Sequence, residues 1–288
     1  MRQNDARDVE GGLGLHARRA IAYIVLVLIT LLCLFWFYIL FINATRSNAQ
    51  LTSGFSLVPR NNLFTNINNV MHGTLPIMRG MLNSFIIAAL ASGLSVYFST
   101  LTAYAIHVYD FKFKNAIFTF ILAVMMIPTQ VTALGFIKLV SNMKLTDSFI
   151  PLIVPAIAAP ATFYYMKQYM ESTLPHAIVE AARIDGAGEV RTFNTISLPM
   201  MKPAIAVQII FAFVFNWNNY FTPALILHDD KKKTLPILIA QLRAADFLKF
   251  DMGQVYATIA LSIFPVIVVY ICLSRFIVGG VALGAVKG

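Results

Sequence analysis

Long runs of apolar residues dominate the chain and are separated by short polar stretches. An α-helix rises 1.5 Å per residue, so about 20 apolar residues cross a hydrocarbon core of about 30 Å. The alternation of apolar and polar residues that is typical of an outer-membrane barrel is absent. The pattern predicts an all-α integral membrane protein with six transmembrane helices, at roughly 19–42, 82–106, 115–138, 150–170, 204–227 and 254–278.

The polar stretches define the expected divisions of the chain. The first 17 residues are polar and glycine-rich without periodicity, which predicts a disordered tail. The segment before the second span is rich in Asn, with Ser, Gly and Pro, and favours loops and short helices over a folded domain. The predicted divisions are an N-terminal tail (1–17), a first transmembrane helix (18–43), an extracytoplasmic segment (44–81), a transmembrane domain (82–279) with a long loop (172–203), and a C-terminal tail (280–288).

The flanks of the first span indicate its orientation. Arg18 and Arg19 precede it, it is longer than a signal-peptide core, and no small-residue cleavage site follows it. We therefore expect an anchor with a cytoplasmic N-terminus, and an even number of spans returns the C-terminus to the same side. Over the whole chain this topology places 12 Lys and Arg inside and 10 outside, which together make the 22 in the sequence, so charge alone barely decides the orientation.

Composition agrees with a membrane protein. The chain is 58% hydrophobic and 12% charged, with a mean hydropathy of +0.73, which excludes an ordinary soluble domain. The net charge is +9, but the basic residues are spread over many loops, which favours lipid headgroups over nucleic acid as a partner. Cys33 and Cys272 fall inside predicted spans, where we expect small core hydrophobes and no disulfide.

Several prolines lie in or at the ends of the predicted spans. Lipid offers no partner for the carbonyls that proline frees, so neighbouring helices or water must satisfy them. The prolines are consistent with a bundle that bends around a cavity, and equally with ordinary kinks. They are Pro128, Pro151, Pro155, Pro160, Pro223 and Pro265.

The loop at 172–203 has the pattern of a helix, a turn and a second helix. Thr173 can cap the first helix, Pro175 suits its opening turn, and Gly186 can supply a left-handed residue that stops it. A second helix is expected from about Gly188 to Ile196. Pro199 then prevents its continuation.

The first helix of this loop has two distinct surfaces. Four residues at helical spacing, Ile178, Ala181, Ala182 and Asp185, share a face of small residues that could dock closely on another surface. Glu180 points elsewhere, and Arg183 and Arg191 supply the opposite charge. Amphipathicity alone fits either a helix that lies on the membrane or one that enters a groove in another protein.

The spacing within this loop resembles the cytoplasmic-loop signature of ABC importer permeases. That signature is Glu-Ala-Ala, three residues, Gly, nine residues, then Ile-x-Leu-Pro. All seven fixed positions match over twenty residues: Glu180, Ala181, Ala182, Gly186, Ile196, Leu198 and Pro199.

Further stretches within roughly 80–288 resemble the carbohydrate, or maltose-type, branch of that family. They are Asn83-Ser84-Phe85, Trp217-Asn218-Asn219-Tyr220, Thr234-Leu235-Pro236 and the ending RFIVGGVALGAVKG. Asn219 stands where that branch more often has an acidic residue. The first span and its outer loop carry little of the resemblance.

The resemblance implies that the loop is a coupling helix on the cytoplasmic side, seated in a cleft of a separate ATPase subunit. Four spans precede it, so it shares a side with the N-terminus. The implied assembly contains two ATPase subunits that bind ATP and Mg²⁺, a second and different permease, and an extracytoplasmic sugar-binding protein, in the cytoplasmic (inner) membrane of a prokaryote. The implied coupling residues are Glu180, Ala181, Ala182, Asp185, Gly186, Ile196, Leu198 and Pro199.

The residues themselves give no sign of catalysis on this chain. A phosphate-binding loop of the form GxxxxGK[ST] is absent, and the nearest approach, GGVALGAVKG, lacks Lys-Ser/Thr after its later glycine. His176 and Glu180 are four residues apart but do not form HExxH. We expect a transport subunit without a metal or cofactor of its own.

Polar residues in the fifth predicted span suggest a substrate path. Asn216, Asn219, Tyr220 and Pro223 would share a helical face, and polar groups at that depth should face protein or water. The face could offer hydrogen bonds to sugar hydroxyls, with Trp217 or Tyr220 stacking on a sugar ring, or it could bond to neighbouring helices. Additional candidates are Thr129 and Gln130, beside Pro128 in the third span.

Two other functions stay open at this point. One is a permease for another solute class. The other is a stand-alone secondary transporter or channel, which would need ionisable residues inside the membrane, and the six predicted spans contain almost none away from their ends.

Overall fold

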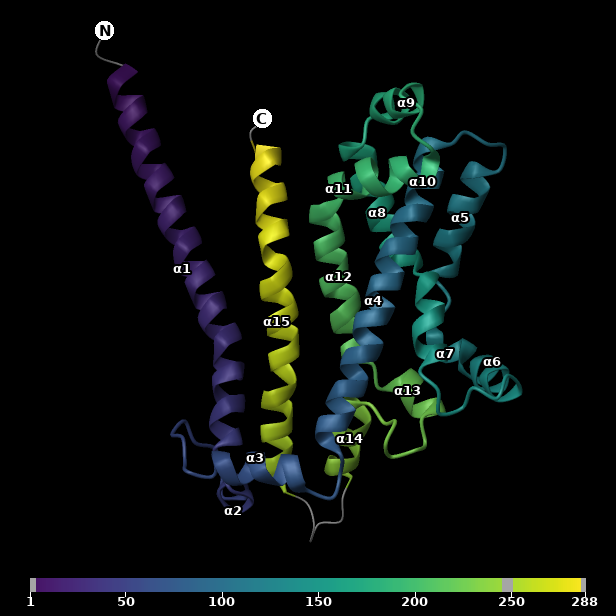
Figure 1. Ribbon diagram of the computed structural model, residues 1–288. Helices are drawn as coiled ribbons and strands as arrows, with labels where there is room; N and C mark the ends of the chain where they lie inside the picture. The colour runs from purple at the N-terminus through teal and green to yellow at the C-terminus, as the bar shows by residue number, and fades with distance from the viewer. Residues whose placement is uncertain (1–3, 245–250, 286–288) are drawn as a thin grey trace. The chain divides into compact units, whose positions relative to one another are not determined.

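The computed structural model describes residues 4–244 and 251–285, with side chains described over 14–244 and 251–277 (Figure 1). All secondary structure in the described residues is helical, which confirms the all-α class. The elements are α1 (Asn4–Ala44), α2 (Asn48–Thr52), α3 (Leu63–His72), α4 (Ile77–Val108), α5 (Lys114–Val124), α6 (Thr129–Asn142), α7 (Ile150–Ile153), η1 (Val154–Ile157), α8 (Pro160–Thr173), α9 (His176–Ile184), α10 (Glu189–Thr192), η2 (Phe193–Ser197), α11 (Leu198–Met200), α12 (Lys202–Trp217), α13 (Phe221–Ile226), α14 (Leu235–Arg243) and α15 (Met252–Ala285).

The chain forms two compact units. The first contains the residues up to Asn69 together with Asp251–Ala260, and the second contains Val70–Phe250 and the residues from Leu261 onward. Three helices in the described residues are long and apolar enough to cross a membrane by themselves, in α1, α4 and α15. They coincide with the first, second and sixth predicted spans.

The third predicted span is not one helix. α5 and α6 meet at an angle of 94°, so the prediction of a continuous helix over 115–138 is wrong. Pro128 sits at the break with φ −64° and ψ 135°, an extended conformation that precedes the first turn of α6. Proline has no N–H to donate to the preceding turn, and its ring clashes with a helical carbonyl there, so the helix restarts in a new direction.

The fourth predicted span is also broken. Residues 150–170 contain α7, the 3₁₀ turn η1 and the start of α8, and the non-helical residues Ala158 and Ala159 separate η1 from α8. Pro155 opens η1 and Pro160 opens α8, positions where a missing N–H costs little.

The fifth predicted span ends early. α12 stops at Trp217 and α13 begins at Phe221, so 204–227 is not a single helix. The Asn219 side-chain oxygen accepts a hydrogen bond from the Thr222 N–H at 3.3 Å, which caps the new helix in place of the lost backbone bonds. Two pairs of helices are bent, α5 with α6 and the α10–α11 segment with α12. If each pair is counted as one crossing, the described residues hold up to five candidate spans.

The N-terminal tail differs from its prediction. α1 begins at Asn4 rather than near residue 18, so the expectation of a disordered tail is wrong from that residue onward. Residues 1–17 contain no proline, and a helix that the apolar run has nucleated gains one hydrogen bond for each residue it adds.

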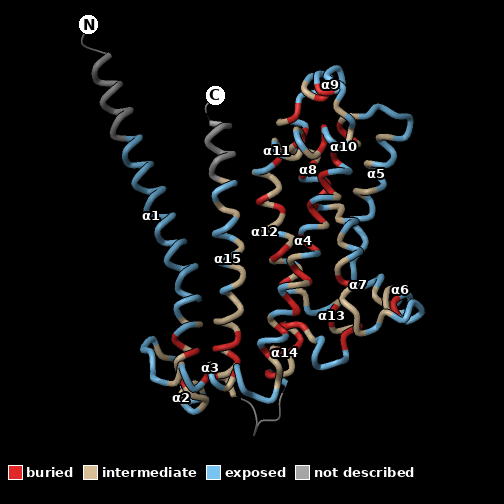
Figure 2. Tube along the Cα trace, viewed as in Figure 1, coloured by how far each residue is buried: buried red, intermediate tan, exposed pale blue. Residues whose placement is uncertain are grey.

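A seam of small residues on α4 forms the centre of the second unit. α4 packs most extensively against α8 and α12, and the buried positions along α4 appear as a red stripe in Figure 2. Small side chains allow helix backbones to approach closely in a membrane, where apolar burial from water does not drive helices together. The seam consists of Ala88, Ala91, Ser92, Ser95, Ser99 and Ala103, each no more than 3% exposed.

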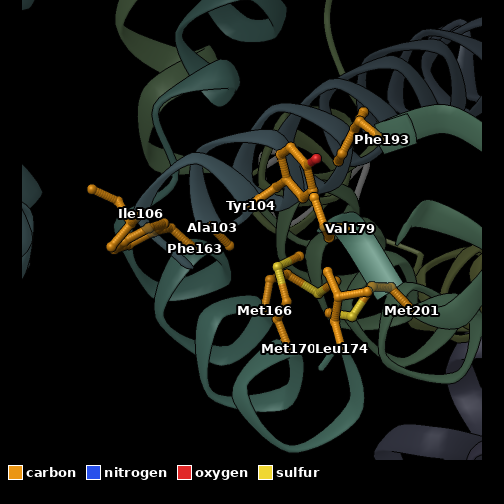
Figure 3. Packing of buried hydrophobic residues seen from close by; sticks show 10 residues of the cluster. All are labelled: Ala103, Tyr104, Ile106, Phe163, Met166, Met170, Leu174, Val179, Phe193 and Met201. Atoms are coloured by element: carbon orange, nitrogen blue, oxygen red, sulfur yellow. The ribbon is translucent and has the colours of Figure 1, made fainter. Parts of the chain in front are cut away.

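Two apolar clusters stand at opposite ends of α4. The Ile cluster lies near its start and contains Ile87, Val140, Leu152, Ile226, Leu227 and Ile237. The Met cluster lies near its end and contains Ala103, Tyr104, Ile106, Phe163, Met166, Met170, Leu174, Val179, Phe193 and Met201 (Figure 3). The connections 109–113 and 174–201 therefore gather at one end of this unit, and 143–149 and 227–234 at the other.

Polar side chains fasten the Ile-cluster end. The Asn83 side-chain amide donates to the carbonyls of Lys231 (3.0 Å) and Lys233 (2.9 Å). The Leu235 N–H donates to the Ser84 hydroxyl at 2.9 Å. These bonds join the Asn-Ser pair of α4 to the backbone just before and within the Thr-Leu-Pro stretch.

Asp147 makes a second connection at this end. Its Oδ1 accepts hydrogen bonds from the backbone N–H groups of His228 (2.6 Å) and Asp229 (2.8 Å). The bond from Asp229 is the main cause that lowers the pKa of the Asp147 carboxyl below its ordinary value. Asp147 has φ 57°, a left-handed conformation that Asp tolerates better than most residues.

The Asn-rich segment of the first unit forms loops and short helices, as its composition predicts. The Asn66 amide donates to the carbonyls of Ala44 and Arg46, both at 2.9 Å, and so satisfies carbonyls at the end of α1. Gly253 lies against this corner, where an added Cβ would be 2.8 Å from both the Arg46 oxygen and the Asn66 amide. A larger residue at 253 would therefore disrupt the packing of α15 on this segment.

The seam predicts a sharp contrast between two neighbouring positions of α4. Ala91 is fully buried, whereas a Cβ added at Gly93 meets no atom within 4 Å. We expect Ala91→Leu to overpack the seam at a cost of about 1–3 kcal/mol. The thermal unfolding temperature of the detergent-solubilised protein should fall by several degrees, while Gly93→Leu should not lower it, because Leu has room there and is a better helix former than Gly. Equal unfolding temperatures for the two variants would contradict the seam.

Candidate functional site

The loop at 172–203 begins with the helix that the sequence predicts, at slightly different bounds. α8 continues through Thr173, so the prediction that Thr173 caps the loop helix is wrong. Pro175 is the residue that precedes α9, where its fixed φ of −65° suits the first turn. Gly186 has φ +79°, and the N–H of Ala187 donates to the carbonyl of Ala182 at 2.9 Å. The predicted left-handed stop at Gly186 is confirmed.

The second half of the loop is more irregular than the predicted helix. α10 is followed by the π-helical turn η2, which contains Ile196, and by α11. Pro199 is near the start of α11, where proline is tolerated, so the prediction that Pro199 ends the helix is wrong. The change of direction comes at Met201, beyond which α12 departs at 82° from the α10–α11 segment.

The docking face predicted for α9 is divided by the structure. Ala182 is buried and Ile178 partly buried, but Ala181 and Asp185 are exposed. The inward stripe is instead Val179 with Ala182, since Val179 has more apolar surface to remove from water than the alanine at 181. Figure 3 shows Val179 among the side chains of the Met cluster.

The opposite surface of α9 is open. Glu180 and Ala181 are exposed, and Ile184 is 86% exposed. Val190, after the turn, is 77% exposed. Within the described part of the chain Glu180 makes no hydrogen bond or ion pair, so its carboxylate is free to meet a partner.

A charged and aromatic network holds the two halves of the loop together. The Arg183 Nε donates to Glu189 Oε1 at 2.7 Å, and this bond raises the pKa of the Arg183 guanidinium. The hydroxyl of Tyr104, from α4, donates to Glu189 Oε2 at 3.2 Å. The Arg183 guanidinium also lies 5.4 Å from the centre of the Tyr109 ring, within cation–π range.

The sequence alone named no partner for Arg183. In the structure Arg183 pairs with Glu189, so it organises the loop internally. Tyr104 and Tyr109 were not among the predicted site residues, because neither belongs to the loop. Their proximity arises from the tertiary packing of α4 on the loop, which local spacing does not reveal.

The candidate path residues of the fifth span are divided by the break after α12. Asn216 and Trp217 lie on α12, whereas Asn219 and Tyr220 lie between the two helices, so the predicted single face is wrong. Trp217 is 3% exposed and its ring stacks on Phe213 at 5.8 Å, so it serves the core. The Asn216 amide donates to the Ala212 carbonyl within the helix.

Three candidates keep exposed polar or aromatic surface. Tyr220 is 49% exposed at the break between α12 and α13. Thr129 and Gln130 are exposed at the start of α6, where the third span bends. The bent segments also meet, because α6 contacts α13.

The remaining candidate groups are possible metal ligands and the two cysteines. No cluster of three His, Cys, Asp or Glu side chains that could hold a metal occurs in the described residues. Cys33 and Cys272 are free and exposed in the single chain, so the prediction that they pack in the core is wrong. Cys33 lies on α1, which is exposed over most of its described length, and Cys272 lies in the later part of α15, where several residues are exposed.

Comparison with known proteins gives consistent matches. The family described as "Binding-protein-dependent transport system inner membrane component" matches residues 95–282. The arabinooligosaccharides transport system permease protein AraQ of Bacillus subtilis (strain 168) is 30% identical over 268 residues, 91% of this chain and 93% of the relative. The sn-glycerol-3-phosphate transport system permease protein UgpE of Yersinia pestis bv. Antiqua (strain Antiqua) is 33% identical over 265 residues, 90% of this chain and 94% of the relative.

A solved structure shows the same fold. It is described as a bacterial ABC transporter involved in the import of the acidic polysaccharide alginate. One of its chains matches with a TM-score of 0.77 and covers 90% of this chain and 96% of its own length. The sequences are 22% identical, so this similarity concerns the fold alone.

The Glu189 network predicts a local effect on loop dynamics. Glu189→Gln removes the charge that Arg183 binds, so backbone amides over 176–192 should exchange with deuterium faster than in the parent. Glu180→Gln is the matched control, because Glu180 has no partner in the described residues and Gln is a comparable helix former. Exchange that rises equally in both variants would show that the pair does not order the loop.

Proposed function

We propose, since this chain belongs to the family of binding-protein-dependent transport system inner membrane components, that it is the permease subunit of an ATP-driven sugar importer. The observation that carries the proposal is the α9 loop. It presents an exposed surface around Glu180 and Ile184 while its other side is bonded and packed to α4. Such a helix can transmit the movement of a bound partner subunit to the helix bundle.

The proposed partners are those that the family resemblance implies. The sequence contains no phosphate-binding loop, and in this proposal two separate ATPase subunits bind ATP and Mg²⁺. We assign the loop residues Glu180, Ala181, Asp185 and Gly186 to the contact or its geometry, and Ala182, Ile196, Leu198 and Pro199 to the support behind it. A second, different permease and an extracytoplasmic sugar-binding protein complete the assembly.

The proposed topology has six crossings and a cytoplasmic N-terminus. α1, α4 and α15 are whole crossings, α5–α6 is a bent one, and α7–α8 and α12–α13 are interrupted ones. The alternation of connections between the two ends of α4 supports this order, because 109–113 and the α9 loop share an end. The C-terminal tail then lies on the cytoplasmic side as well.

The proposed mechanism is alternating access. ATP-driven closure of the ATPase subunits moves α9, and the Arg183–Glu189–Tyr104 network transmits the movement to α4. Because α8 and α12 pack against the α4 seam, they move with it. The pore then opens toward the binding protein.

The proposed cargo is a neutral or weakly charged sugar. Residues 203–227, which contain α13 and all of α12 after Lys202, have no charged side chain, and the polar groups there are mainly amides and hydroxyls. Tyr220 and Asn219 are the first candidates for cargo contact. Thr129 and Gln130, at the start of α6, are further candidates, and we assign Asn216 and Trp217 to the support of this region. The alternatives are a permease for another solute class, such as a phosphorylated polyol, and a stand-alone secondary transporter.

Exposed residues in the two units allow a direct test of the docking site. Ile184 in α9 is 86% exposed and Phe64 in α3 is 83% exposed. We expect a photoreactive amino acid at Ile184 to crosslink an ATPase subunit in membranes of the native host, because α9 enters its groove. The same amino acid at Phe64 should give no ATPase adduct, since the proposed topology places α3 outside.

The crosslinked and co-purified proteins are then identified by mass spectrometry. An ATPase with a phosphate-binding loop, a second permease and an extracytoplasmic binding protein would support the importer. A chain that purifies alone, with no adduct at Ile184, would favour the secondary transporter.

Tyr220 and Trp217 should behave differently in uptake assays. Tyr220→Ala removes an exposed ring, so we expect roughly a two- to tenfold higher KM for sugar uptake at normal abundance. Trp217→Ala opens a cavity worth about 3–5 kcal/mol and should instead lower the amount of folded protein.

Tyr270→Ala is the matched control, because Tyr270 is also a largely exposed tyrosine, at 55%, but lies on α15. Its KM should stay at the parent value. An unchanged KM in Tyr220→Ala would remove Tyr220 from the cargo path.

A further inference from the structure

A cleft of about 220 Å³ opens between α4, α5, α8 and the first turn of α9. It belongs neither to the exposed surface of α9 nor to the candidate path. Most of its lining is polar, and the polar side chains are His107, Lys114, Asn115, Lys167, Glu171 and His176.

The charged groups of the cleft are held by weak local pairs. Lys167 Nζ lies 2.6 Å from Glu171 Oε1 and 4.6 Å from the centre of the Phe118 ring. Lys114 Nζ lies 3.6 Å from Asp110, whose side chain is fully exposed and outside the lining. Lys167 and Glu171 are four residues apart on α8, whereas Asp110 lies in the connection before α5. Single local ion pairs of this kind contribute little to stability and exchange readily with a better partner.

The lining has an excess of positive charge. Two ammonium groups face one carboxylate, and the two imidazoles add hydrogen-bonding capacity. His107 is bound through Nε2 to the Leu174 carbonyl at 2.9 Å and stacks on His176 with ring centres 4.5 Å apart. A phosphate group matches this set, because lysine ammonium groups bind phosphate oxygens as point charges.

The surroundings point to a phosphate that carries acyl chains. α5, which supplies Lys114 and Asn115, exposes Ile117 (42%) and Phe120 (69%), and Phe113 just before it is 62% exposed. In a membrane protein such side chains face lipid or other apolar surface. The cleft is also smaller than the roughly 300–1,000 Å³ of pockets for drug-sized ligands, so it suits a headgroup.

We propose that this cleft binds the phosphate headgroup of an anionic phospholipid. The two lysines hold the phosphate, and Glu171 releases Lys167 when the lipid enters. The site joins α5 and α8 to His176, the first residue of α9, across the Leu174–Pro175 link. An occupied cleft therefore stiffens the base of α9. That regulatory consequence rests on the proposed function, whereas lipid binding does not.

Photocrosslinking from Asn115 tests the site directly. The purified chain, with whichever subunits accompany it, is placed in nanodiscs of phosphatidylcholine alone or with added phosphatidylglycerol. A photoreactive amino acid at 115 should give a phosphatidylglycerol adduct, identified by mass spectrometry. We expect Lys114→Gln and Lys167→Gln each to reduce the adduct about fivefold.

Two further variants separate binding from a structural role. Lys114→Arg with Lys167→Arg keeps both charges and should retain the adduct. Glu171→Gln removes the competing carboxylate and should increase it, although it breaks the same ion pair as Lys167→Gln. If the pair only stabilised the fold, both of its variants would lower the adduct. Lys112→Gln is the control, because Lys112 is exposed nearby but does not line the cleft.

The outcomes distinguish the sources of the phosphate. Loss of the adduct on adding inorganic phosphate at constant ionic strength would identify a free anion as the ligand and overturn the lipid assignment. Equal adducts in both kinds of nanodisc, or no effect of the lysine variants, would also overturn it. A strong adduct on a chain that purifies without an ATPase would support lipid binding in the cleft and would contradict the proposed importer function.

Discussion

The close approach of α8 and α12 to the small-residue seam of α4 is the constraint on which the second unit depends. Helices in a membrane gain little from hiding apolar side chains, so they associate where backbones come close and polar groups find partners. The alanines and serines of the seam supply that closeness, and Ser99 adds a hydrogen bond to the Ala159 carbonyl at 3.3 Å. Besides α8 and α12, the elements α7, η1, α14 and η2 of this unit also contact α4.

The breaks in the predicted spans follow from the same requirement. A helix interruption at membrane depth leaves backbone groups unpaired unless protein satisfies them. The described structure supplies such partners, as when Ser99 donates to Ala159 beside the break before α8, and Asn219 accepts from Thr222 beside the break before α13. These two interruptions are therefore found where α4 or a side-chain hydrogen bond is near, and the second one sets the polar positions around Tyr220.

Sequence reasoning captured the elements whose signal is local. Apolar length predicts α1, α4 and α15, and glycine chemistry predicts the left-handed residue at Gly186. Hydropathy averaged over a long window cannot detect the breaks, because the polar residues beside Pro128 and Asn218 are short interruptions of otherwise apolar runs. The division of the α9 face and the bond from Tyr104 to Glu189 depend on α4, which is distant in sequence.

Stiff and interrupted segments are arranged in an order that suits transmission of force. The α9 loop is joined to α4 by the hydrogen bond from Tyr104 to Glu189 and by the Met cluster. α4 in turn packs against α12 along the seam. Closely packed interiors transmit strain with little deformation. The backbone at 158–159 and 218–220, which is outside any helix, is the softer part. On the proposed function, movement that enters at α9 is therefore expected to appear as bending beside Tyr220, where the candidate cargo contacts lie.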